Sequence, residues 1–203
     1  MQIRAAIFDF GNVLVQWDAR NLYKRFFPDL RAVDSFLEEI HFTEWNAKQD
    51  AGRSFHDGVA ELSKQFPQYA DLIQAYDIHW EESLVESFEE TIEIARQLKQ
   101  NGLNLYILTN SSAEKFPIAK QKYPFLEELF EGIIISGEHK LLKPDPAIYH
   151  LTLNRIQRNA NECIFIDDSL PNIETARELG FHAIHFHSPA QLRMSLREEL
   201  LEK

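Results

Sequence analysis

Short, continuous apolar runs recur along the chain, and each has the length of a strand that is buried on both faces. Between these runs, apolar residues recur at helical spacing, as in Phe88, Ile92, Ala95 and Leu98. Strands that alternate with helices predict an α/β fold in which helices cover both faces of a parallel sheet. The expected strands are 3–8, 103–108, 133–135, 163–166 and 183–186, and the main expected helices are 88–98, 113–122, 146–156, 170–180 and 189–201.

The stretch from about residue 18 to residue 84 has a different pattern. It contains no convincing strand, and its apolar residues follow helical spacing, as in Leu22, Phe26 and Phe27. Prolines and a glycine divide it into several short helices. We therefore expect an α/β core domain formed by residues 1–16 and 86–203, with a small all-helical domain, residues 17–85, inserted after the first strand.

Polar side chains with catalytic potential follow three of the expected strands. Asp9 follows the first strand, Thr109 the second, and the pair Asp167 and Asp168 the fourth. Because the carboxyl ends of parallel strands lie at one edge of a sheet, where open α/β folds bind ligands, we expect these groups to meet. Lys143 lies in a loop stiffened by prolines and is expected to join them. Carboxylates, a hydroxyl and a lysine together suit a divalent cation and a phosphate.

Each of these residues also has a simpler structural interpretation. Asp9 is a candidate cap of a turn, Thr109 and Asn110 are candidates for a helix N-cap cluster, and Lys143 for an ordinary surface lysine. The acidic pair is harder to explain in this way, since capping needs one such residue. Two adjacent carboxylates at a buried edge repel each other unless a cation is present, and Mg²⁺ is the natural ion for oxygen ligands.

Composition narrows the range of partners. The chain has 203 residues, enough for one domain with an insertion, and 44% of them are hydrophobic. The formal net charge of −11 argues against nucleic acid or an anionic membrane as a partner and favours a small molecule. A single cysteine, Cys163, excludes an intrachain disulfide and fits a reducing compartment. No apolar stretch is long enough to span a bilayer, so a cytoplasmic location is expected.

In their order, the polar segments resemble the four motifs of the haloacid dehalogenase-like (HAD) hydrolase superfamily, and the resemblance extends over essentially the whole chain. It implies a Rossmann-like parallel sheet. The helical insertion resembles the superfamily's small α-helical cap, so residues 17–85 are called the cap below. The matching segments are 7–13 (IFDFGNV), 108–111 (LTNS), 143–149 (KPDPAIY) and 165–169 (FIDDS).

The resemblance implies roles for individual residues. Asp9 would attack phosphorus and form an aspartyl-phosphate, Thr109 would hold the phosphoryl group, and Lys143 would steady both. Mg²⁺ would be the cofactor, with Asp168 as the direct ligand of the acidic pair and Asp167 as the water-mediated one. The complete set of implied metal ligands is Asp9, the backbone carbonyl of Gly11, Asp167 and Asp168.

One position departs from the pattern. Most phosphatases of the superfamily carry a second aspartate two residues after the nucleophile, as the acid and base for the leaving group and water. Here that position is Gly11, which has no side chain. A positioned acid–base group typically contributes a factor of about 10² to 10⁴ in rate. The Asp-x-Gly-Asn pattern, which ends in Asn12, resembles a subgroup that includes sugar-phosphate (glucose-1-phosphate) phosphatases.

Two hypotheses account for the missing group. Either it comes from elsewhere, with Asp18, Glu44, Asp50 and His56 as candidates, or the enzyme uses substrates with good leaving groups, such as anomeric sugar phosphates. The segment from Trp45 to Arg53 resembles the family's specificity loop. The residues expected to bind substrate are Asn110, Gly11, Asn12, Asp18 and Arg53, and Trp17, Trp45 and Trp80 are candidates either for stacking on a substrate or for packing the cap.

The sequence therefore predicts a Mg²⁺-dependent phosphatase that acts on a small phosphorylated metabolite, with a sugar phosphate as the expected substrate. The alternatives are a β-phosphoglucomutase-like phosphomutase, a 2-haloacid dehalogenase that uses Asp9 on carbon, and a non-catalytic binding protein of the same fold. The expected assembly is a monomer or a homodimer.

Overall fold

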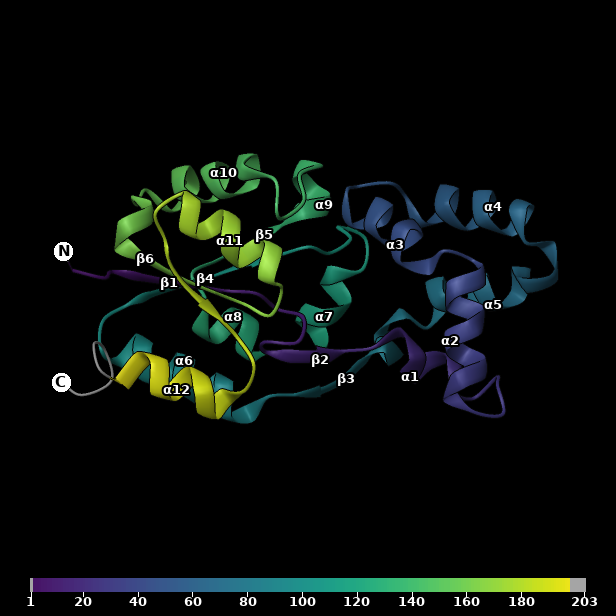
Figure 1. Ribbon diagram of the computed structural model, residues 1–203, viewed down its shortest axis with the longest axis horizontal. Coiled ribbons are helices and arrows are strands. Elements are labelled where there is room, and N and C mark those ends of the chain that lie inside the picture. The colour runs from purple at the N-terminus through teal and green to yellow at the C-terminus, as the bar shows by residue number, and fades with distance from the viewer. Residues whose placement is uncertain (1, 198–203) are drawn as a thin grey trace.

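A five-stranded parallel sheet forms the centre of one half of the molecule (Figure 1). The computed structural model describes residues 2–197. The strand order is β5-β4-β1-β6-β7, which confirms the predicted Rossmann-like α/β fold. The strands lie within two residues of their expected positions: β1 (Ala5–Phe8), β4 (Asn104–Thr109), β5 (Gly132–Ile135), β6 (Cys163–Asp167) and β7 (His182–His185).

The central strand β1 shows why the sheet strands are continuously apolar. Ala6 and Phe8 pack into the hydrophobic cluster on one face of the sheet, whereas Ala5 and Ile7 pack into the cluster on the other face. All of them have no exposed surface. A strand covered on both faces needs an apolar residue at every position, so its sequence is a run and not an alternation.

Helices cover both faces of the sheet (Figure 1). α10 and α11 pack on the face that bears Ile7, and α6, α8 and α12 pack on the opposite face. α7 begins at Phe116, later than predicted, because Pro117 fits the first turn of a helix and not its interior. The predicted residues 198–201 of the last helix lie outside the described residues. The bounds are α6 (Glu89–Gln100), α7 (Phe116–Lys122), α8 (Phe125–Leu129), α9 (Ser136–His139), α10 (Pro146–Ile156), α11 (Leu170–Glu178) and α12 (Pro189–Arg197), with a 3₁₀ turn η3 at Ala160–Glu162.

The cap is helical and lies beyond one end of the sheet (Figure 1). Aromatic rings form its interior: Tyr76 has ring contacts with Tyr23, Phe42, Trp45 and Phe55. Its elements are α1 (Ala19–Tyr23), α2 (Leu30–Glu39), α3 (Phe42–Asp50), α4 (Phe55–Gln65), η1 (Pro67–Tyr69), α5 (Ala70–Ile78) and η2 (Trp80–Ser83).

Two short antiparallel strands, β2 (Val15–Trp17) and β3 (Leu84–Ser87), connect the sheet to the cap helices. These two strands were not expected from the sequence, because strands this short and only partly buried produce no clear periodicity. The predicted domain boundaries, at 16/17 and 85/86, fall within this ribbon. Among residues 2–197, no helix has both the length and the apolar character needed to cross a bilayer.

Candidate active site

The predicted strand ends meet at one edge of the sheet. β1 lies between β4 and β6, and Phe8 at its end is level with Ile107 and Ile166 on the two neighbours. The N–H of Asp9 donates to the carbonyl of Ile166 over 2.8 Å, which ties the residue after β1 to the end of β6. The parallel register therefore brings the polar residues after these strands to the same level.

Three carboxylates and one ammonium group form the centre of the site. Asp9, Asp167 and Asp168 each place a carboxylate oxygen within 4.8 Å of the others. The Nζ of Lys143 lies 2.9 Å from Oδ1 of Asp9 and 2.7 Å from Oδ2 of Asp167. Because Lys143 is only 4% exposed, its ammonium group interacts with these carboxylates and hardly with solvent. One ammonium leaves the cluster of three carboxylates with excess negative charge, which suits a bound cation.

Burial and mutual repulsion change the acidity of these groups. Burial raises the pKa of Asp9 to about 7 against the opposing charge of Lys143, and the charges of Asp167 and Asp168 add to the rise. Burial also raises the pKa of Asp168, as does the charge of Asp167. For Lys143, burial lowers the pKa, but the charges of Asp167 and Asp9 outweigh it and raise the pKa overall. Lys143 is therefore an ammonium at neutral pH.

The two acids of the pair have different surroundings. The carboxylate of Asp167 accepts hydrogen bonds from the backbone N–H of Ser169 and from the ammonium of Lys143. The side-chain nitrogen of Asn172 donates to both oxygens of the same carboxylate. Asp168, in contrast, lines the pocket beside Asp9. Both oxygens of Asp167 therefore accept hydrogen bonds within the protein, whereas the carboxylate of Asp168 reaches the pocket. That Asp168 binds the metal directly and Asp167 through water stays a prediction.

Asn110 positions the loop that carries Lys143. Its side-chain oxygen accepts from the backbone N–H of Lys143 over 2.8 Å, and its side-chain nitrogen donates to the Lys143 carbonyl over 2.9 Å. Nζ of Lys143 also donates to the carbonyl of Leu108. Both polar atoms of the Asn110 side chain are therefore hydrogen-bonded to the backbone of Lys143, and Asn110 also lines the pocket. Its role in substrate binding stays a prediction.

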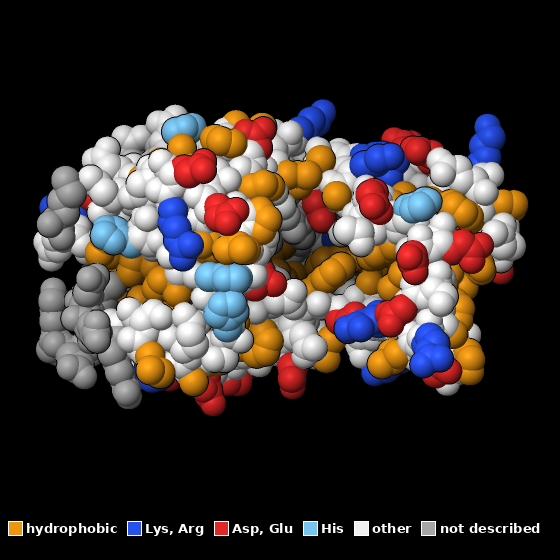
Figure 2. All heavy atoms as spheres, in the orientation of Figure 1, with side chains coloured by type: hydrophobic (Ala, Val, Ile, Leu, Met, Phe, Trp, Pro, Cys, Tyr) orange, Lys and Arg blue, Asp and Glu red, His pale blue; other side chains and the backbone are white. Residues whose placement is uncertain are grey.

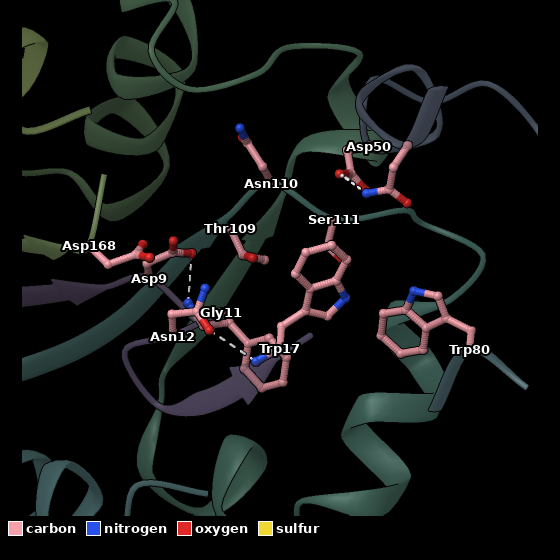
Figure 3. Close-up of a pocket in the computed structure, with 12 residues that line it drawn as sticks. Asp9, Gly11, Asn12, Trp17, Asp50, Trp80, Thr109, Asn110, Ser111 and Asp168 are labelled. Atoms are coloured by element: carbon pink, nitrogen blue, oxygen red, sulfur yellow. Dashed lines mark hydrogen bonds between the residues drawn. The ribbon is translucent and has the colours of Figure 1, made fainter. Parts of the chain in front are cut away.

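A pocket of about 160 Å³ opens beside the carboxylates (Figure 3). Its sheet side carries Asp9, Asp168 and Thr109, whereas Asp50 and Trp80 stand on the opposite side in the close-up. In the space-filling view the surface is hollowed between the sheet half and the cap half (Figure 2). The residues that line the pocket are Asp9, Phe10, Gly11, Asn12, Trp17, Asn46, Asp50, Trp80, Thr109, Asn110, Ser111 and Asp168.

Two predicted substrate residues do not line this pocket. Asp18 caps α1 and forms an ion pair with Arg20 at 2.9 Å; partial burial raises its pKa, but the hydrogen bonds and charge of Arg20 outweigh this and lower the pKa overall. Arg53 donates to the side chains of Gln49 and Glu61 and so holds cap helices together. A substrate role for Asp18 or Arg53 stays a prediction.

Of the proposed sources of the missing acid–base group, only one lines the pocket among the described residues. Glu44 lies with Asp18 along a different, open depression of the surface, and His56 is exposed on α4. Asp50, the last residue of α3, lines the pocket.

Three contributors were not foreseen from the sequence. Asn172 holds Asp167, Asn46 faces the pocket next to Asp50, and Ser136 of α9 joins the cap to the sheet. Asn46 lay in the segment that resembles the specificity loop and Asn172 in the helix expected at 170–180, but no role was predicted for either side chain. Of the tryptophans, Trp17 and Trp80 line the pocket, whereas the third, Trp45, is 5% exposed and donates its indole N–H to the Gly58 carbonyl inside the cap.

Comparison with known proteins gives a consistent result. A protein-family model described as haloacid dehalogenase-like hydrolase matches residues 3–180. The chain is 27% identical to sesquiterpene phosphatase astK of Aspergillus oryzae, over 96% of this chain and 95% of that protein. It is 28% identical to acyl-CoA dehydrogenase family member 10 of Mus musculus over 92% of this chain, but it spans only 18% of that protein's length.

The fold is also similar to that of a solved structure. HAD family enzyme BT-2542 of Bacteroides thetaiotaomicron matches with a TM-score of 0.75 at 20% identity, over 97% of this chain and 100% of that one. Its complex with magnesium and inorganic phosphate matches with a TM-score of 0.71 at 22% identity, over 92% and 95% of the two chains. At this identity the likeness establishes a shared fold.

Proposed function

The chain belongs to the haloacid dehalogenase-like hydrolases, and from this premise we propose that it is a Mg²⁺-dependent phosphatase of a small phosphorylated metabolite. One observation carries the proposal. A buried lysine, Lys143, bridges Asp9 and Asp167, and Asp9 lines the pocket together with Asp168. This arrangement aims a carboxylate nucleophile at a cavity and leaves negative charge for a cation to neutralise.

The donor set fits Mg²⁺. The site offers carboxylate oxygens within 4.8 Å of one another and a single ammonium to balance them, and a hard cation with oxygen ligands matches that chemistry. Asp9, Asp168 and the carbonyl of Gly11 would hold the ion, with Asp167 acting through water. When bound, Mg²⁺ would neutralise charge on the phosphoryl oxygens and keep Asp9 ionised.

The protein's own groups suggest the course of the reaction. The backbone N–H of Phe10 and the ammonium of Lys143 both donate to Oδ1 of Asp9, which leaves Oδ2 to attack phosphorus. As the phosphorus–ester oxygen bond breaks, the Thr109 hydroxyl and Lys143 would stabilise the charge on the transferring group. Water then attacks the aspartyl-phosphate, releases inorganic phosphate and regenerates Asp9.

The side of the pocket away from Asp9 supports a small, uncharged leaving group. It is lined by Trp17 and Trp80 together with the polar side chains of Asn46 and Asp50. Among the described lining residues there is no lysine or arginine to receive a second anionic group. A sugar has both apolar faces and hydroxyls, so we retain a sugar phosphate as the proposed substrate.

We propose a cytoplasmic location, a monomer or homodimer, and a small phosphorylated substrate with no nucleic-acid or membrane partner. A 2-haloacid dehalogenase reaction on Asp9 is the main rival. It needs no metal, and it would leave the three clustered carboxylates uncompensated except by Lys143.

A screen of phosphorylated metabolites tests the proposal. We expect phosphate release that requires Mg²⁺, stops in EDTA, and falls by ~10⁴-fold or more in Asp9→Asn, as removal of a nucleophile does in other hydrolases. Acid-quenched wild-type protein should carry one phosphoryl group on Asp9, detected by mass spectrometry. Chloride release from 2-haloacids without phosphate release, or phosphate release retained by Asp9→Asn, would refute it.

A further inference from the structure

The proposed reaction has to place a proton on the leaving oxygen, and the usual place for the donor is empty. The position two residues after Asp9 is Gly11, which has no side chain and so cannot act as an acid. An alkoxide is a poor leaving group at neutral pH, so an unassisted reaction on an ordinary alcohol ester would be slow. The donor therefore has to be sought among the residues that reach the same cavity.

The titratable side chains in the described lining of the pocket are three aspartates: Asp9, Asp168 and Asp50. Asp9 is the proposed nucleophile, and Asp168 belongs to the proposed metal site. Asp50 approaches from the cap, on the side where a leaving group would lie (Figure 3). The other lining groups, such as Asn46 and Thr109, do not exchange protons readily near neutral pH.

We propose that Asp50 supplies the proton to the leaving oxygen and then takes the proton of the attacking water, in place of the acid missing at Gly11. The proposal rests on the phosphatase function proposed above. It assigns a catalytic role to a residue of the cap, so the reacting groups are complete only when the cap is docked on the sheet domain.

Hydrogen bonds hold the Asp50 carboxyl group in the pocket. The side-chain nitrogen of Asn46 donates to Oδ2 of Asp50 over 2.9 Å, and the Tyr76 hydroxyl donates to the side-chain oxygen of Asn46, which fixes the orientation of the amide. The backbone N–H of Ser112, from the sheet domain, also donates to the Asp50 carboxyl group. Asp50 is thus held from both sides of the junction.

The backbone around Asp50 is docked equally closely. The hydroxyl of Ser136 donates to the Asp50 carbonyl over 2.6 Å and itself accepts from the N–H of Ser111, two residues after the end of β4. Gly52 lies so close to α9 that a Cβ there would come within 2.8 Å of the Gly137 carbonyl oxygen. These contacts place the end of α3 against the edge of the sheet that carries the reacting groups.

The environment of Asp50 suits a proton donor. Burial raises the pKa of Asp50 to about 8, against the lowering effect of the Ser112 N–H, and the charge of Asp9 adds to the rise. The charged group that acts on it is Asp9, which directly follows β1. Tyr76 on α5 feels the charge of Asp50 in turn, but burial is the main cause that raises the pKa of Tyr76 well above its ordinary value, so Tyr76 stays neutral. Asp50 therefore begins the cycle protonated at neutral pH.

Each step of the proposed cycle balances. Oδ2 of Asp9 forms a bond to phosphorus, the bond from phosphorus to the ester oxygen breaks, and that oxygen takes the proton of Asp50 and leaves as an alcohol. Asp50 is then a carboxylate. It accepts a proton from the water that attacks phosphorus, the bond from Asp9 to phosphorus breaks, and inorganic phosphate leaves, with Asp9 ionised and Asp50 protonated again.

The test is a series of phosphate monoesters with leaving groups of graded acidity, assayed with Mg²⁺ on the wild type and on Asp50→Asn. We expect Asp50→Asn to lose about 10²- to 10⁴-fold in kcat/KM on alkyl phosphates. The loss should shrink toward none on p-nitrophenyl phosphate, whose leaving group needs no proton. The fall of kcat/KM above about pH 8 should disappear in the variant.

If Asp50→Asn does not fold, the role of Asp50 can still be tested on the wild type alone. The dependence of its rate on leaving-group acidity should steepen as the pH rises past about 8, where Asp50 loses its proton. Glu44→Gln, which changes a cap carboxylate outside the pocket, is the matched control and should behave as the wild type.

Rescue gives the sharpest discrimination. A Cβ at Gly11 would meet nothing nearer than Trp17 Cβ at 4.0 Å, so the double variant Gly11→Asp with Asp50→Asn should recover activity on alkyl phosphates. An equal loss on every ester in Asp50→Asn, with the alkaline limb retained, would overturn the role of Asp50. Full activity in Asp9→Asn would instead overturn the phosphatase function, so the two failures are distinguishable.

Discussion

The two walls of the pocket are built in different ways. The wall on the sheet side consists of residues that follow strands, such as Asp9 and Thr109, and the hydrogen-bond register of the parallel sheet sets their positions. The wall on the cap side, with Asn46, Asp50 and Trp80, depends on contacts made across the junction between cap and sheet. A ladder of backbone bonds is rigid, whereas a junction held by a few contacts opens at a lower free-energy cost.

This difference suggests a division of labour. The rigid wall would hold the groups that bind the metal and attack phosphorus, whose geometry has to be accurate to fractions of an ångström. The docked wall would receive the leaving group, move its proton and open to release it. Contacts that bridge the junction include the backbone N–H of Phe55 donating to Glu114 and an ion pair between Lys115 and Asp77.

The largest effect is expected in the sheet-side wall, from Lys143→Met. Removing the ammonium leaves Asp9 and Asp167 buried without their partner, which typically costs about 3–5 kcal/mol. We expect that loss in the free energy of unfolding at neutral pH in EDTA, measured by urea denaturation, with partial recovery on adding Mg²⁺ or lowering the pH. Lys140→Met, at an exposed position, is the control and should change stability by less than about 0.5 kcal/mol. A similar small change in Lys143→Met would contradict the buried bridge.

The next effect tests the docking of the cap-side wall, through Gly52→Ala. The added Cβ would press on the Gly137 carbonyl, and φ of Gly52 is +93°, so the end of α3 should be displaced. Misplacing a catalytic group by about 1 Å can cost on the order of 10²-fold in rate. We expect kcat to fall by about that factor while Mg²⁺ binding to the sheet-side wall is retained.

Gly102→Ala is the matched control for Gly52→Ala. Gly102 also has a positive φ, +88°, but a Cβ there would meet nothing within 4 Å. It should therefore lose stability through backbone strain without losing kcat. Equal kcat values for the two variants would show that the contact between Gly52 and α9 does not position the active site.

A third effect is a pH dependence of stability. The pKa of Asp50 is about 8 in the folded protein against 3.8 for the ordinary group, so between these values the folded state binds more protons than the unfolded state. Its contribution to the free energy of unfolding therefore falls as the pH rises from about 4 to about 8, by at most about 1.4 kcal/mol per pH unit. Asp9 and Asp168 act in the same direction, so the readout is the difference between wild type and Asp50→Asn. Parallel curves for the two proteins would contradict the buried environment of Asp50.

The smallest effect concerns Asp18, which the sequence suggested as a substrate or acid–base residue. It caps α1 by accepting from the N–H of Arg20 and does not line the pocket. We expect Asp18→Ala to lower stability by about 1 kcal/mol, the usual cost of losing an N-cap, and to leave kcat unchanged. A tenfold or greater fall in kcat would show that Asp18 contributes to catalysis after all.

The sheet-side wall could be predicted from the sequence because each of its parts is local. A buried strand is recognisable as an apolar run, and a carboxylate directly after it lies at the ligand-binding edge of a parallel sheet. Asp9, Thr109 and the Asp167–Asp168 pair satisfied that pattern, and the structure brings them together. The β2–β3 ribbon escaped prediction because its strands are too short to show a period.

The choice among the cap candidates could not be made in the same way. Asp18, Glu44, Asp50 and His56 all lie on or beside short helices, and helical spacing does not tell which way a helix faces once it docks. The same limit hid Asn172, whose bond to Asp167 depends on the position of α11 over β6.

By itself, the sequence determined the α/β fold, the helical insertion and the acidic groups at the strand ends, since these follow from residue patterns that act within a strand or a helix. Only the tertiary structure decided that Lys143 bridges two carboxylates and that Asp50, rather than another acid of the cap, reaches the pocket. Those outcomes depend on contacts between segments far apart in the chain, such as Ser136 with Asp50. The free energies of such contacts are set by packing and burial, which no local pattern encodes.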